Sequence, residues 1–149
     1  MTSARPFRRW ILPVLALAVV SVAWSAAPTQ DGPDLHDLMR GVKKSLRTLG
    51  DALKDPAADA QALDALAEME VLLLASKGHD PSNLAEVPRG DRDGHRAAYR
   101  ADMARTLITT LELEIALLEG RRDAAAEMLR GPLLQQRNDG HDKYQPADG

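Results

Sequence analysis

Apolar residues recur every three or four positions along four segments of the chain, with polar residues between them. This period predicts four amphipathic helices, because one face of an α-helix returns about every 3.6 residues. The first helix is expected from about Pro33, where proline suits a first turn, to Leu53. Its apolar positions follow the alternating steps of four and three residues of a bundle helix: Leu35, Met39, Val42, Leu46, Leu49 and Leu53.

The second helix is expected from Pro56, capped by Asp55, to about Ser76, with a stop at Lys77-Gly78. Its apolar positions are Leu63, Leu66, Met69 and Leu73. A polar link broken by prolines and glycines follows, from residue 79 to residue 94. The third helix is expected to begin near His95 and to end at Gly120. Its predicted apolar face comprises Tyr99, Met103, Leu107, Leu111, Ile115 and Leu118.

The fourth helix is predicted to begin at Arg121-Arg122-Asp123 and to reach His141. Its apolar positions are Ala125, Met128, Leu129, Leu133 and Leu134. The pair Gly131-Pro132 inside this helix predicts a kink or bulge, because proline removes a backbone hydrogen bond and clashes with the preceding turn.

Four helices with short links and no strand pattern predict an all-α fold, an antiparallel up-down-up-down four-helix bundle over residues 34–145. In this topology the start of the first helix and the end of the fourth lie side by side. The same end of the bundle would hold all four histidines: His36, His79, His95 and His141.

Residues 1–25 are typical of a secretory signal peptide. Three arginines precede an apolar run over residues 10–22. Small residues follow this run, and cleavage is expected after Ser25. Residues 26–33 are then a lead-in and residues 146–149 a tail. The expected location is the periplasm. The apolar run is short for a bilayer span, so membrane attachment is expected only with an uncleaved signal.

Removing residues 1–25 takes away three arginines and no acidic residue, which changes the net charge from −3 to −6. Such a charge argues against nucleic acid as a partner and favours a basic protein. The absence of cysteine excludes disulfides and covalent haem attachment through a C-x-x-C-H motif. No nucleophile elbow, paired catalytic carboxylates or HExxH motif is present, so no enzymatic activity is expected.

One thioether and one imidazole are the candidate ligands of the predicted bundle. Met39 lies one turn into the first helix, and His141 ends the fourth, so the topology brings them to the same end. Methionine and histidine on opposite faces of a haem iron leave no site for oxygen, which suits electron transfer. The mature chain keeps only Tyr99 and Tyr144 as aromatic residues, and a planar cofactor would fill its aliphatic core well. From spacing alone, both residues also suit ordinary bundle positions.

Three stretches carry a resemblance to a known family. They are Leu35 to Met39 with its continuation to Ala52, then Asp64 to Met69, and finally Arg137 to Tyr144 with His141 inside it. The chain from about Asp34 to Tyr144 resembles the soluble periplasmic cytochrome b562 family.

The resemblance implies that Met39 and His141 are the axial ligands of a haem b. It also implies that further residues surround the haem: Leu35, Val42, Tyr99, Met103 and Arg137. Arg137 matches a position where cysteine in relatives allows covalent attachment, so the haem is expected to be non-covalent. Two family aromatics are replaced here by Met103 and Gly140. The fourth helix carries one extra residue near Gly131-Pro132.

Three alternatives stay open at this point. The four histidines, with Asp37, Asp80 and Asp142 nearby, suit a copper or zinc site in a haem-free bundle. A periplasmic helical binding protein without any cofactor is the second. In the third, His36, three residues before Met39, competes as an iron ligand and gives a site with two histidines.

Overall fold

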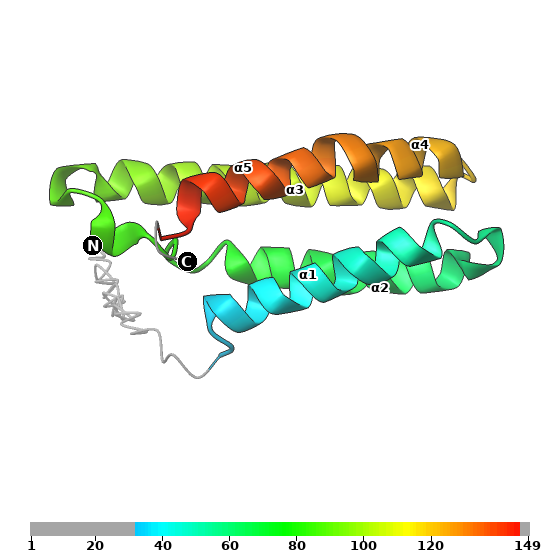
Figure 1. Cartoon of the computed structure of the whole chain (residues 1–149), viewed down its shortest axis with the longest axis horizontal. Helices are drawn as coiled ribbons and strands as arrows, with labels where there is room; N and C mark the ends of the chain where they lie inside the picture. Colours follow the sequence, from blue (N-terminus) through cyan, green and yellow to red (C-terminus); the bar gives the residue numbers. More distant parts are fainter. Residues whose placement is uncertain (1–31, 147–149) are drawn as a thin grey trace, which may run out of the picture. The chain divides into compact units, whose positions relative to one another are not determined.

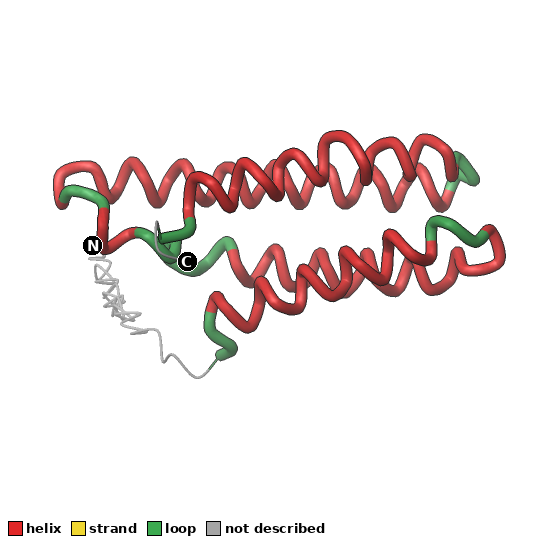
Figure 2. Tube along the Cα trace, viewed as in Figure 1, coloured by secondary structure: helices red, strands yellow, loops and turns green. Residues whose placement is uncertain are grey.

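The computed structural model describes residues 32–146 of the chain. These residues form helices and no strand (Figures 1 and 2), so the predicted all-α class is confirmed. The first three helices are α1 (Leu35–Ala52), α2 (Asp59–Ser76) and α3 (Arg92–Leu118). The predicted signal peptide lies outside the described residues. In the described part, no helix is long and apolar enough to cross a membrane.

The fourth helix is continuous and consists of three pieces: α4 (Arg122–Met128), a π-helical segment (Leu129–Leu133) and α5 (Leu134–Tyr144). The wide turn contains Pro132, which confirms the bulge predicted from Gly131-Pro132. A π-turn accommodates one more residue than an α-turn. In this wide turn, no backbone hydrogen bond needs the amide hydrogen that proline lacks. Leu129 and Leu133, at the two ends of the segment, both remain buried.

Aspartates cap the first two helical segments. The Asp34 carboxylate accepts a hydrogen bond from the Asp37 amide at 2.8 Å, which satisfies a free donor of the α1 amino terminus. Asp55 accepts from the Ala57 amide at 2.9 Å. The second helix was predicted to start at Pro56, but Pro56–Ala58 form a short 3₁₀ turn, and α2 begins at Asp59.

The link between α2 and α3 is shorter than predicted. Helix α3 begins at Arg92, three residues before His95, and includes Gly94. The Arg92 guanidinium donates to the carbonyls of Val87 and Ala85 at 3.0 and 3.1 Å, and so it ties the link to the first turn of α3. These bonds help to offset the cost of glycine within a helix, about 1 kcal/mol. The helix ends before Gly120, whose positive φ of 73° favours glycine.

Each helix packs on its neighbour in the sequence: α1 on α2, α2 on α3, and α3 on α4 and α5. Small residues on α1 face α2. A side chain at Gly41 would meet the Leu72 side chain at 2.8 Å, so glycine permits the close approach of these two helices. The Ser45 hydroxyl donates to the Glu68 carboxylate on α2 at 2.9 Å.

This packing corrects the predicted stripe of α1. Of its six members only Leu49 is fully buried, and Leu35, Met39, Val42 and Leu46 are half-buried. The buried positions of α1 are shifted toward α2, where the small residues allow contact: Leu38, Ser45, Leu49 and Ala52.

The predicted apolar face of α3 is wrong in its second half. Leu111, Ile115 and Leu118 are 39%, 49% and 64% exposed. The prediction followed steps of four residues from Tyr99, and each such step turns about 40° past a full circle. After three or four steps the stripe has therefore left the buried face. The face that is buried there consists of Thr109, Thr110, Leu113, Ala116 and Leu117.

Candidate functional site

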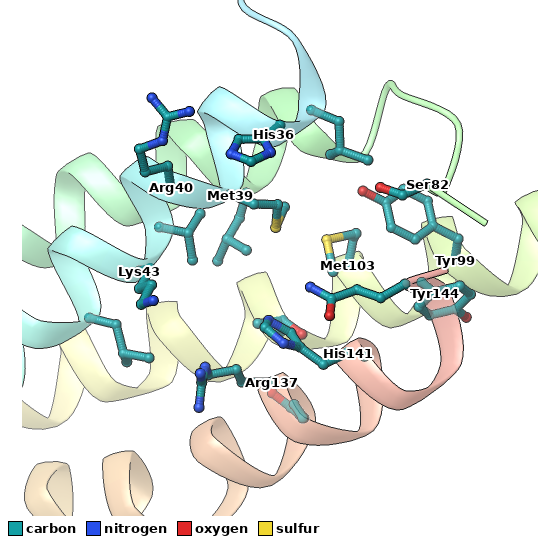
Figure 3. Close-up of a pocket in the computed structure, with 18 residues that line it drawn as sticks. His36, Met39, Arg40, Lys43, Ser82, Tyr99, Met103, Arg137, His141 and Tyr144 are labelled. Carbon is teal, nitrogen blue, oxygen red and sulfur yellow. The ribbon is translucent and has the colours of Figure 1, made fainter. Parts of the chain in front are cut away.

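A cavity of about 480 Å³ lies among α1, α3 and α5 (Figure 3). All seven residues predicted for the site line it: Leu35, Met39, Val42, Tyr99, Met103, Arg137 and His141. Its volume is in the range of small-molecule and cofactor sites, roughly 300–1,000 Å³. The structure therefore brings the candidate residues together around one space, whereas the ligand that they hold stays a prediction.

Helix α1 supplies one wall of this cavity. Leu35, Met39, Val42 and Leu46 recur with the helix period, and all four are half-buried because they face the cavity. Met39 points its thioether into the cavity, as Figure 3 shows. Its polarisable sulfur and unbranched chain suit both a gap-filling role and a ligand role.

Helix α5 supplies the opposite wall. His141 lies in its last turns and is exposed at the cavity. Figure 3 shows its imidazole across the cavity from Met39. The two candidate ligands therefore come from the first and last helices of the described chain, and each projects toward the space between them.

The last turn of α5 is fixed by α3 through Asp102. The Tyr144 hydroxyl donates to the Asp102 carboxylate at 2.5 Å, and the Lys143 ammonium donates to the same oxygen at 2.9 Å. Burial alone would raise the pKa of Asp102, but these hydrogen bonds and the Lys143 charge outweigh it and lower the pKa. A charged Asp102 therefore holds the turn that carries His141.

The link before α3 fixes the same turn from another side. The Asn83 backbone amide donates to the Tyr144 carbonyl at 3.2 Å. The Asn83 side-chain amide donates to the Lys143 carbonyl at 3.0 Å. The Asn83 side-chain oxygen lies 2.9 Å from the His95 ring nitrogen Nε2. His95 in turn packs its ring edge-on to Tyr144, with centroids 5.2 Å apart. His95 therefore has a structural position beside the cavity.

Tyr99 closes the cavity on the α3 side. Its hydroxyl donates to the Ser76 carbonyl at 3.1 Å, and its ring packs edge-on against Tyr144 with centroids 5.1 Å apart. Burial, and next the neighbouring Tyr144, raise the pKa of Tyr99 to about 12. The phenol is therefore neutral across the physiological range.

Three cationic side chains lie around the cavity: Arg40, Lys43 and Arg137. All are exposed, and Arg40 pairs with Asp37 at 3.1 Å. No aspartate or glutamate is among the cavity-lining residues of the described chain. The electrostatic environment therefore favours a ligand that carries acidic groups over a divalent cation with hard ligands.

The histidines do not form a cluster. His36 and His141 line the cavity, whereas His79 and His95 do not. Within residues 32–146, no three His, Asp or Glu side chains are grouped so that they would hold a metal ion. All four histidines belong to this range, so the histidine-cluster alternative has no assembled site there.

Sequence reasoning missed Gln136. It lines the cavity, its amide nitrogen donates to the Thr109 hydroxyl at 3.0 Å, and its side-chain oxygen is buried without a hydrogen-bond partner. The signal was a polar residue on the apolar seam of the fourth helix, three residues after Leu133. A buried acceptor without a partner is uncommon and marks a polar point in the cavity wall.

Comparisons of the chain with protein-family models, curated proteins and solved structures gave no match.

Proposed function

We propose that the cavity holds a non-covalent haem b, with Met39 and His141 as axial ligands, and that the protein transfers electrons in the periplasm. The observation that carries the proposal is that a thioether on α1 and an imidazole on α5 line one cavity from opposite sides. The resemblance of this chain to the cytochrome b562 family supports the same pair of ligands.

The other lining residues suit haem. Leu35, Val42, Leu46 and Leu73 supply apolar wall for a planar ring, and Tyr99 bounds it with a neutral phenol. The positive charges of Arg40, Lys43 and Arg137 suit the two acidic groups of haem. No carboxylate in the described lining would repel these acidic groups. When bound, the haem supplies a one-electron iron couple.

The two ligands determine what the site does with that couple. With His141 and Met39 both holding the iron, no open position would be left for oxygen or peroxide. The soft sulfur of Met39 would favour the ferrous state and raise the reduction potential. Such a site suits electron transfer and not catalysis.

The antiparallel up-down-up-down order of the helices is part of this proposal, because it explains why the first and fourth helices share the cavity. The expected export signal at residues 1–25 supports a periplasmic location. The acidic mature chain, with a net charge of −6, favours a basic redox protein as its partner.

Axial-ligand variants test the assignment. After hemin reconstitution, His141→Ala should lose nearly all haem binding, and Met39→Ala should keep haem with a high-spin, five-coordinate spectrum and a lower potential. Met128→Ala, a partly buried methionine that does not line the cavity, is the control. Wild-type spectra in both ligand variants would contradict the assignment.

His36 requires one further variant, because it lines the cavity three residues before Met39. If the histidine replaces the missing sulfur, Met39→Ala stays low-spin and the double variant with His36→Ala becomes high-spin. If Met39 is the native ligand, His36→Ala alone keeps the wild-type potential. A large fall in potential for His36→Ala would instead assign the site with two histidines.

A further inference from the structure

The cavity contains a second thioether. Met103 on α3 lines it together with Met39 and His141, and Figure 3 shows both sulfur atoms pointing into the cavity. The haem proposal uses only the Met39 sulfur as a ligand. Three helices thus bring two thioethers and one imidazole to the same space, and Met103 has no polar role in the site described above.

This set of donors is selective for a soft metal ion. Thioether sulfur prefers monovalent copper, and imidazole also binds copper well. Calcium, magnesium and manganese need carboxylate or carbonyl oxygen, and no Asp or Glu of the described chain lines the cavity. We propose that the haem-free protein binds one cuprous ion in this cavity through the sulfur atoms of Met39 and Met103 and the imidazole of His141.

The surrounding positive charges favour a monovalent ion over a divalent one. Arg40, Lys43 and Arg137 line the cavity and repel any cation, and a doubly charged ion is repelled about twice as strongly as a singly charged one. The three side chains are exposed, so water and salt screen their charge. A monovalent ion with neutral donors is therefore tolerated, whereas zinc is disfavoured both by charge and by the sulfur donors.

This site goes beyond the proposed electron-transfer function. Copper and haem would share Met39 and His141, so each excludes the other from the cavity. Met103 separates the two ligands: its sulfur binds copper but is not an axial ligand of haem. A Met103→Leu substitution therefore removes a copper ligand and conserves the volume of the side chain.

The test is an anaerobic titration of the haem-free protein with cuprous ion, in competition with the chromophoric chelator bicinchoninate. Wild type should withdraw one copper per chain from the chelator. Met103→Leu and Met39→Leu should each weaken the affinity at least about tenfold, since even lost outer-shell partners cost this much. Met128→Leu, outside the cavity, should bind as wild type does. Zinc should not compete.

Circular dichroism of each variant verifies that the helices are retained. Failure of wild type to compete with bicinchoninate, or equal affinity of wild type and Met103→Leu, would overturn the copper site. Hemin titration of the same proteins separates the two proposals. Copper binding by the wild type without any haem binding would overturn the haem function alone, and haem binding without copper binding would overturn the copper site alone.

Discussion

Two parts of the same bundle differ in how their apolar side chains are buried. In the packed region, Leu49, Leu66 and Leu113 are fully buried among small residues such as Ala62 and Ala116. In the cavity region, Leu35, Met39, Val42 and Leu46 lie on the same kind of helical stripe but are only half-buried. The pattern of apolar residues alone does not distinguish the two regions.

The difference lies in what stands opposite each stripe. Alanines allow helices to approach, so the leucines of the packed region fill the space between them. On α1, Gly41 and Ser45 lie against α2, and the stripe that contains Met39 faces the cavity. Apolar surface that is only partly packed and lines a cavity is suited to bind an apolar ligand. The comparison thus separates a region that holds the bundle together from a region that lines the cavity proposed to bind haem.

The largest effect is expected from leucine-to-alanine substitutions, made once in the packed region and once in the cavity region. Leu49→Ala, in the packed region of α1, should lower the free energy of unfolding by about 2–5 kcal/mol. Leu46→Ala, one turn earlier on the same helix, should cost roughly half of that or less in haem-free protein, because its side chain already faces a cavity. Urea denaturation of both variants gives the two values.

Adding hemin should reduce this difference. A ligand that binds only the folded state adds about 2.7 kcal/mol at a hundredfold excess over its dissociation constant. Leu46→Ala should lose part of this gain, whereas Leu49→Ala should keep it. Equal losses in haem-free protein would show that the two regions are packed alike.

The helices were predictable because spacing and caps are local. Asp55 begins a helical segment and Gly120 follows the end of one, as the sequence indicates, and Gly131-Pro132 produces the bulge. The expected topology predicted that Met39 and His141 lie at the same end, and the family resemblance predicted the other five residues that line the cavity. The depth of burial was not predictable, because it depends on how far apart two helices stand. The exposed face of α3 shows this: Leu111, Ile115 and Leu118 fit a sequence stripe that turns away from the neighbouring helices.

An intermediate effect is expected at the π-turn, which lies between the packed region and His141. Deleting Gly131, together with Pro132→Ala, should convert the wide turn into regular α-helix and keep α5 in the same rotational phase. Haem binding should persist. Inserting one alanine after Gly131 should rotate His141 by about 100° away from the cavity and weaken haem binding strongly. Hemin titration distinguishes the variants, and equal haem affinity for both would contradict this role of the bulge.

The smallest effect concerns the border of the cavity at Tyr99. Tyr99→Phe removes the hydrogen bond to the Ser76 carbonyl and should cost about 1 kcal/mol at neutral pH. Since the folded pKa of Tyr99 is raised from 10.0 to about 12, its contribution is complete below pH 10 and is lost as pH rises toward 12. The variant should lose less stability over that window, as urea titrations at pH 9, 10 and 11 would show. An identical pH profile would mean that the Tyr99 phenol is not buried as described.

The most direct measurement is the visible absorption spectrum of the protein, purified from a haem-replete host and then reduced with dithionite. A strong Soret peak with sharp α and β bands is the expected result, because imidazole and thioether give a six-coordinate, low-spin haem b. Absence of a Soret band even after hemin is added would contradict the central claim that the cavity between α1 and α5 binds haem.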